Sequence, residues 1–207
     1  MSKFEGPFES GEVLWYTGGL QIDADGAPNA YGPHGGLDFI GNAGKPGNWW
    51  GVVTDGDGNP IVQGNSDPAP GFYISTTALV DPSKKRADPI RYVDSATIPY
   101  ISVPKDAVTS YGIHVGDLGY AYNINNQQGT WAIIADVGPK GKWGEGSIAL
   151  AEALGIESSP KHGGCESGIV FLVFRGSKAG WARDLQEAAN TAMNLLAEAG
   201  GIESFLS

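Results

Sequence analysis

The sequence predicts a mainly β, α+β fold that forms a single domain over residues 1–207. The first observation is the 32 glycines and 13 prolines, a density typical of many tight turns between short strands. The second is that most apolar segments are only four to six residues long. The third is one long helical period close to the C-terminus. We find no internal repeat and no linker that would divide the chain.

The first half of the chain alternates short apolar segments with loops. Pro99 stands inside one of these segments and lacks a backbone donor, which predicts an edge position or a bulge there. Residues 31–60 are almost entirely loop, with Trp49 and Trp50 opening a strand near their end. We expect strands at 13–16, 19–22, 49–53, 61–63, 72–77 and 98–103.

The second half carries stronger signals. Residues 118–123 and 130–135 flank a polar turn and predict a hairpin. A short helix is expected over 147–154, closed by Gly155. Residues 169–174 are continuously apolar and predict a strand buried on both faces. A long helix is expected over 178–199, capped by Ser177 and ended by Gly200–Gly201. Its apolar positions are Trp181, Leu185, Ala188, Ala192, Leu195 and Leu196.

Composition excludes several classes of function. The net charge is −10, and the one basic cluster, Lys84–Arg86, is predicted to be a solvated loop, so we expect no nucleic-acid partner. An acidic surface suits a cationic substrate, or else only keeps the protein in solution. No apolar run reaches 18 residues, so we expect no membrane partner. A single cysteine, Cys165, cannot form an internal disulfide.

The most informative stretch holds two carboxylates, Asp136 and Glu145, nine positions apart. An apolar strand leads into Asp136, a glycine-rich loop follows, and a helix starts just after Glu145. Cleavage of a glycosidic bond needs two carboxyl groups on opposite sides of a small gap. The alternative is structural: Asp136 before Gly-Pro forms a turn, and Glu145 stabilises a helix N-terminus.

Two other acidic stretches resemble parts of calcium loops. Asp55-x-Asp57-x-Asn59 has Pro60 where the sharp turn of an EF-hand needs glycine. The Asp23-Ala-Asp25-Gly segment lacks the rest of such a loop. Both are predicted to be turns, and we expect no metal and no cofactor.

Several of these segments together resemble the fungal-type chitosanases of glycoside hydrolase family 75 and their bacterial relatives. The resemblance spans about residues 20–177 and is most specific in Ala135-Asp-Val-Gly-Pro139 and in Gly144-Glu-Gly-Ser147. It implies an inverting endo-hydrolase of chitosan with Asp136 and Glu145 as the catalytic pair. The sequence departs from the family pattern at Ala24, where the fungal enzymes tend to have cysteine.

A second likeness concerns the fold. Asp136-Val-Gly-Pro, the short helix after it and the final buried strand are similar to the closing half of a double-psi β-barrel, as in lytic transglycosylases and some cellulases. We therefore expect a double-psi β-barrel-like core with a short helix and a long C-terminal helix.

The expected chemistry requires an acid and a base of different character. We favour Asp136 as the acid and Glu145 as the base, although the sequence leaves the roles exchangeable. Asp23, Asp25 and Asp67 are candidates for binding the amines of chitosan, with simple turn formation as the alternative. Trp143 is the favoured sugar-stacking residue, ahead of Trp49 and Trp50, with a place in the core as the alternative.

The function expected from these features is endo-cleavage of β-1,4 linkages in chitosan by a monomer. A peptidoglycan-cleaving glycosidase, either a muramidase or a lytic transglycosylase, is the second hypothesis. A carbohydrate-binding domain without turnover is the third. Residues 1–7 lack the apolar core of a signal peptide. We nevertheless expect an extracellular or exported protein, in keeping with its polysaccharide substrate.

Overall fold

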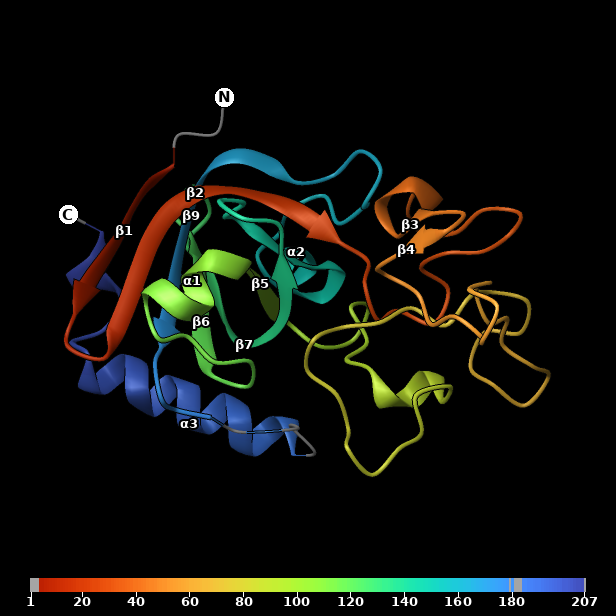
Figure 1. Ribbon diagram of the computed structural model, residues 1–207. Helices are drawn as coiled ribbons and strands as arrows, with labels where there is room; N and C mark the ends of the chain where they lie inside the picture. The colour runs from red at the N-terminus through yellow and green to blue at the C-terminus, as the bar shows by residue number, and fades with distance from the viewer. Residues whose placement is uncertain (1–3, 179, 181–183, 207) are drawn as a thin grey trace.

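The computed structural model describes residues 4–178, 180 and 184–206 (Figure 1). The strands are β1 Glu5–Ser10, β2 Val13–Asp23, β3 Gly44–Lys45, β4 Asn48–Trp49, β5 Tyr100–Pro104, β6 Leu118–Asn123, β7 Gln128–Gly138, β8 Glu145–Ser147 and β9 Cys165–Phe174. The α-helices are α1 Lys105–Ser110, α2 Ile148–Ala153 and α3 Leu185–Glu198. Within the described ranges no helix has the length and apolarity needed to span a membrane.

Six strands close into a β-barrel. They follow one another in the order β2-β8-β5-β7-β6-β9, and β9 pairs again with β2. Two of these contacts, β2 with β8 and β5 with β7, are parallel, and the other four are antiparallel. β1 adds to the outer edge of β2. The predicted mainly β class is confirmed, and the predicted hairpin is formed by β6 and β7.

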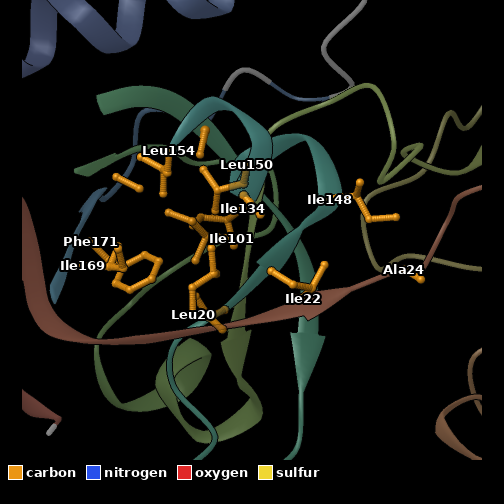
Figure 2. Packing of buried hydrophobic residues seen from close by; sticks show 14 of the residues in the cluster. Leu20, Ile22, Ala24, Ile101, Ile134, Ile148, Leu150, Leu154, Ile169 and Phe171 are labelled. Atoms are coloured by element: carbon orange, nitrogen blue, oxygen red, sulfur yellow. The ribbon is translucent and has the colours of Figure 1, made fainter. Parts of the chain in front are cut away.

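Alternate residues of the barrel strands pack into two separate hydrophobic clusters. In β9, Ile169, Phe171 and Val173 belong to the cluster that fills the barrel, together with Leu20 and Ile134 (Figure 2). Residues of the opposite parity in the same strand pack on the outer face beneath α3. This arrangement explains why 169–174 is apolar at every position, as the sequence predicted.

Helix α3 covers the outside of the barrel with one small-residue face. Ala188, Ala192 and Leu196 are buried in the outer cluster. The C-terminal end at Gly200 was predicted correctly, but the start at residue 178 was wrong. Asp184 is the N-cap and accepts a hydrogen bond from the Glu187 amide, whereas Ser177 Oγ accepts one from Leu118 N. The predicted apolar position Trp181 lies outside the described residues.

The chain between β2 and β5, residues 24–99, forms a long irregular excursion beside the barrel (Figure 1). Three strands were predicted in it, but only the two-residue β3 and β4 and isolated bridges such as Val52 with Ser75 are present. Side chains make backbone hydrogen bonds here in place of a strand ladder. Gln63 donates to the carbonyls of Pro28 and Tyr73 and accepts from Ala69 N. Glycine and proline limit regular pairing in this segment.

Two further strand predictions need correction. The segments 13–16 and 19–22 form one continuous strand, β2, rather than two. The strand near Pro99 lies at the centre of the sheet between β7 and β8, not at an edge, whereas the predicted alternative, a bulge, is present as a register shift in its ladder with β7 between Ile101 and Ser102. It begins at Tyr100, so Pro99 stands just before the ladder and removes no donor from it.

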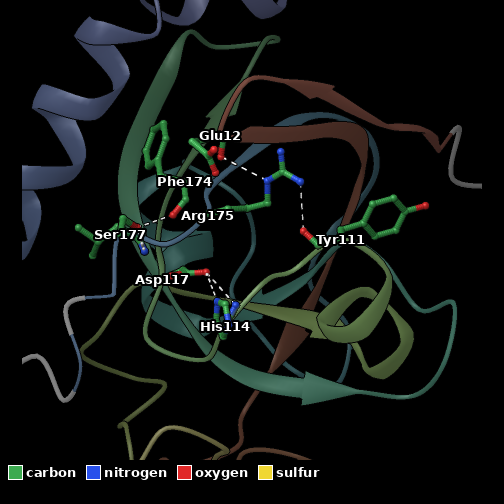
Figure 3. Close-up of polar contacts among 8 residues, drawn as sticks. Glu12, Tyr111, His114, Asp117, Phe174, Arg175 and Ser177 are labelled. Atoms are coloured by element: carbon green, nitrogen blue, oxygen red, sulfur yellow. Dashed lines mark hydrogen bonds and ion pairs between the residues drawn. The ribbon is translucent and has the colours of Figure 1, made fainter.

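A polar cluster holds the turn between β1 and β2 to the neighbouring elements (Figure 3). Arg175, just after β9, donates to the carbonyls of Glu12 and Tyr111 and pairs with the Glu9 carboxylate at 2.9 Å. Asp117, which is fully buried, accepts a hydrogen bond from His114 N.

Candidate active site

Strand β5 carries Ser102 between two acidic neighbours. Ser102 is the register partner of Asp136 on β7 and of Glu145 on β8. Side chains of directly paired residues project from the same face of a sheet. The two predicted catalytic residues therefore share one face, with the serine hydroxyl between them.

A register shift in β7 turns Asp136 to this face. Ile101 pairs with Ile134, whereas the next residue, Ser102, pairs with Asp136, so Ala135 is an extra residue. Simple alternation from Ile134, which points into the barrel, would point Asp136 inward as well. The inserted residue moves the carboxylate to the outer face, which is a known use of bulges next to functional sites.

The excursion covers this outer face and fixes Asp136. Ala78 N donates to Asp136 Oδ1 at 2.9 Å, and Leu79 N donates to the carbonyl of Ala135. Asp136 was predicted at the end of its strand, but β7 continues to Gly138. Burial raises the pKa of Asp136 from 3.8 to about 6, and the charge of Glu145 acts in the same direction. The Ala78 hydrogen bond opposes the shift.

Glu145 occupies the start of strand β8, and the short helix predicted over 147–154 follows it as α2, with Ser147 as its N-cap. β8 pairs in parallel with β2 and antiparallel with β5, and α2 begins only at Ile148. The Glu145 carboxylate forms an ion pair of 2.7 Å with Lys142 Nζ. The Glu145 side chain is 14% exposed and the Lys142 side chain 39%, so solvent reaches this pair from the lysine side.

Asp23 and Asp25 extend the acidic face at the end of β2. Carboxylate oxygens of Asp23, Asp25 and Asp136 all lie within 4.8 Å of one another. Burial raises the pKa of Asp23 well above its ordinary value, and the charges of Asp136 and Glu145 add to the effect. Burial and then the charge of Asp23 raise the pKa of Asp25. Tyr31 O–H donates to Asp25 at 2.7 Å.

This trio is chemically able to take up a positive charge. Three carboxylates held this close repel one another, and either protons or a cation would relieve the repulsion. Oxygen ligands of this kind suit Mg²⁺ or Ca²⁺, and an organic ammonium would satisfy the same electrostatics. The Asp55 segment forms a turn as predicted, with Asp55 Oδ1 accepting from Asp57 N and Asn59 N.

All four of these carboxylates line one cleft of about 820 Å³. Its walls come from β2, from the end of β7 and the loop after it, from the excursion and from the segment before β9. Other polar or aromatic residues in its lining are Gln21, Tyr31, Asp38, Asn42, Trp50, Lys142 and Lys161.

Two of the predicted binding residues are placed elsewhere. Trp143 is not among the described residues that line the cleft; it packs against Tyr16, with ring centroids 4.7 Å apart, and stacks on Phe4. Asp67 likewise does not line it and instead accepts a hydrogen bond from Gly64 N within its own turn. For both residues the structural alternative describes their position.

Trp50 is the tryptophan that reaches the cleft. It is 59% exposed, and its indole Nε1 donates to the carbonyl of Asn42, which fixes the ring orientation. Trp49 is half-buried against the core. Of the two adjacent tryptophans, Trp49 therefore packs against the core and Trp50 lines the cleft. The sequence alone did not distinguish them.

Several cleft residues were not predicted. Lys142 lies within the candidate stretch but has no motif signal of its own. Ser102 comes from a distant segment and pairs with Asp136 and Glu145, although it is not among the described residues that line the cleft. Tyr31 comes from the excursion and Lys161 from the segment before β9, and only the fold brings both to the cleft. The alternation of β5 marks Ser102 as an outward residue, which is the one signal that was available.

A scan against models of known protein families gave no match for this chain, and a search among proteins of curated function gave no match either.

Proposed function

We propose that this protein is an endo-acting hydrolase that cleaves the β-1,4 linkages of chitosan with inversion of configuration. One observation carries the proposal. Asp136 and Glu145 flank β5 on the same face and open onto the same cleft. Two strand spacings separate their backbones by about 10 Å, which is compatible with the gap of about 6.5–9.5 Å between the carboxyl groups of inverting glycosidases.

The surroundings of the two carboxyl groups suggest their roles. Asp136, with its raised pKa of about 6, holds a proton at mildly acidic pH and suits the acid that protonates the leaving oxygen. Glu145 forms an ion pair with Lys142 and, as the partner of Asp136 across β5, suits the base that takes a proton from water. This supports the assignment favoured from the sequence.

The rest of the cleft suits an amino sugar. The amines of chitosan are cationic at mildly acidic pH, and Asp23 and Asp25 would accept charge-assisted hydrogen bonds from them. Binding of an ammonium would also relieve the repulsion among the three close carboxylates. Trp50 presents an exposed and oriented ring on which a sugar face could stack. We assign no sugar-binding role to Asp67 or Trp143, which are not among the described residues that line the cleft.

The barrel suggests the finer fold class as well. A closed six-stranded barrel in which two strand contacts are parallel and the others antiparallel supports a double-psi arrangement. We propose that the core belongs to this class. Because its polysaccharide substrate is found outside cells, we also propose that the protein is exported.

The decisive experiment removes each carboxylate in turn. Asp136→Asn and Glu145→Gln should each keep the melting temperature within a few degrees and lower chitosan hydrolysis by at least about 1,000-fold. Asp67→Asn, an acid outside the cleft, is the matched control and should keep full activity. NMR of the first product should show the inverted anomer. Near wild-type activity in either cleft variant would overturn the assignment.

A peptidoglycan-cleaving glycosidase is the second candidate, since Lys142 and Lys161 in the cleft would suit a polymer that carries carboxylates. Chitosan and purified peptidoglycan should therefore be offered side by side, with products identified by mass. An anhydro-sugar product would indicate a lytic transglycosylase. Binding to chitosan without any degradation would instead identify a carbohydrate-binding domain.

A further inference from the structure

Ser102 lies at the centre of the row formed by Asp136, Ser102 and Glu145 on three adjacent strands. Both acidic residues are its register partners, so its hydroxyl projects from the same face as the two carboxylates. The residue is only 1% exposed. An inverting hydrolase needs room for its attacking water between two such carboxyl groups.

The hydroxyl of Ser102 has no hydrogen-bond partner among the residues that the structure describes. The other buried serines around the site are fully used. Ser147 Oγ accepts from Tyr100 N and Leu150 N, and Ser95 Oγ accepts from Ile148 N and donates to the Asp23 carbonyl. Buried hydroxyls without a partner are rare, and each one calls for a specific explanation.

Gly138 lies next to both the Ser102 hydroxyl and the Glu145 carboxylate. A Cβ atom built on Gly138 would lie 2.9 Å from Glu145 Oε2 and 3.4 Å from Ser102 Oγ. Both oxygens therefore lie next to the face of Gly138 that a side chain would occupy, and a bridging water would supply the bond that the Ser102 hydroxyl lacks. The glycine keeps this face open, because any side chain would crowd the carboxylate.

We infer that Ser102 positions the attacking water for Glu145, an inference that rests on the proposed hydrolase function. The water donates one hydrogen to Glu145 and the other to Ser102 Oγ, which leaves a lone pair free to face the anomeric carbon. As the water oxygen bonds to that carbon, Glu145 takes its proton. The bond from the anomeric carbon to the leaving oxygen breaks, its electron pair stays on that oxygen, and Asp136 supplies the proton there.

The test is Ser102→Ala, assayed on a defined glucosamine oligomer. We expect kcat to fall about 10- to 100-fold with KM within about twofold, because the lost contact orients water and does not hold the sugar. The melting temperature should stay equal or rise, since the hydroxyl makes no bond within the described protein. Ser110→Ala, an exposed serine at the end of α1, is the control and should leave kcat unchanged.

A second variant changes Gly138, the neighbour of both oxygens, and leaves Ser102 in place. Gly138→Ala should also lower kcat, because its methyl group would lie 2.9 Å from Glu145 Oε2 and 3.4 Å from Ser102 Oγ and would force them to move. A crystal structure of the wild type should hold a water within hydrogen-bond distance of both Ser102 Oγ and Glu145, and Ser102→Ala should lack it.

Three results would overturn the inference. A Ser102→Ala enzyme with kcat within twofold of an active wild type refutes the positioning role and leaves the hydrolase proposal standing. A fall in kcat accompanied by a marked fall in melting temperature identifies a structural role instead. A wild type that leaves chitosan intact refutes both proposals.

Discussion

Single residues set the charge state of the cleft. Asp136 is held by one backbone hydrogen bond from Ala78, while burial and the charge of Glu145 act against its ionisation. Burial raises the pKa of Asp23 and of Asp25 well above the ordinary value, and the charges of neighbouring carboxylates, first Asp136 for Asp23 and Asp23 for Asp25, add to it. Folding therefore brings together carboxyl groups that would each be more easily ionised in the unfolded chain, and this lowers stability at neutral pH.

The unfavourable ionisation of Asp136 in the folded state predicts that Asp136→Asn stabilises the protein in a pH-dependent way. The folded pKa of about 6 lies above the ordinary 3.8, so the folded state binds more protons between these values. Stability falls as pH rises through that window, and the penalty is complete above it. The variant should gain about 1–3 kcal/mol at pH 8 and almost nothing at pH 4, measured by urea unfolding. An equal gain at both pH values would contradict the argument.

At the level of elements, periodicity was a good guide where strands are long and paired on both sides. Residues 169–174 and the hairpin of β6 and β7 were predicted from composition and alternation alone. The extra residue Ala135 could not be predicted, because no local pattern distinguishes a bulge from a regular strand. The start of α3 was wrong because Ser177 satisfies Leu118 N from a neighbouring strand, a partner that sequence does not show.

The junction of β8 with α2 depends on Ser147. Its hydroxyl caps α2 through Leu150 N and also accepts from Tyr100 N on β5. Ser147→Ala would leave both amides without this acceptor in a buried site, so we expect a loss of about 2–3 kcal/mol in unfolding free energy. Ser110→Ala, in an exposed helical position, should change stability by less than about 0.5 kcal/mol. If Ser147→Ala and Ser110→Ala changed the unfolding free energy by equally small amounts, the junction would adjust to the loss of the hydroxyl, which contradicts the prediction.

For the whole molecule, the class of fold and the two central carboxylates could be predicted, but the cleft could not. Its walls are contributed by β2, β7, β8 and the excursion, which only barrel closure brings together. Trp50, Tyr31 and Lys161 come from irregular segments whose positions depend on many side-chain contacts. A sequence pattern cannot place such segments, and for the same reason Trp143 was expected in the cleft although it packs against Tyr16.

The overall charge predicts how binding responds to salt. The chain carries a net charge of −10, and five acidic residues, Asp23, Asp25, Asp38, Asp136 and Glu145, line the cleft. In the Glu145→Gln variant, affinity for a glucosamine oligomer should fall about tenfold between 20 and 300 mM NaCl, because salt screens the attraction. Calorimetry with the N-acetylated oligomer is the control and should show little dependence on salt. Equal salt dependence for both sugars would refute an electrostatic origin.

The excursion of residues 24–99 leaves the barrel after β2 and returns at β5, so one uninterrupted piece of chain supplies Asp25, Tyr31 and Trp50. Asp136 and Glu145 belong to the barrel itself. Under the proposed function, most residues that would contact the sugar and the two residues that would cleave the bond therefore lie in different stretches of chain. Exchange of the excursion for another of similar length would be an evolutionary and an engineering route to new polymers, provided that the replacement again donates an amide hydrogen bond to Asp136, as Ala78 does.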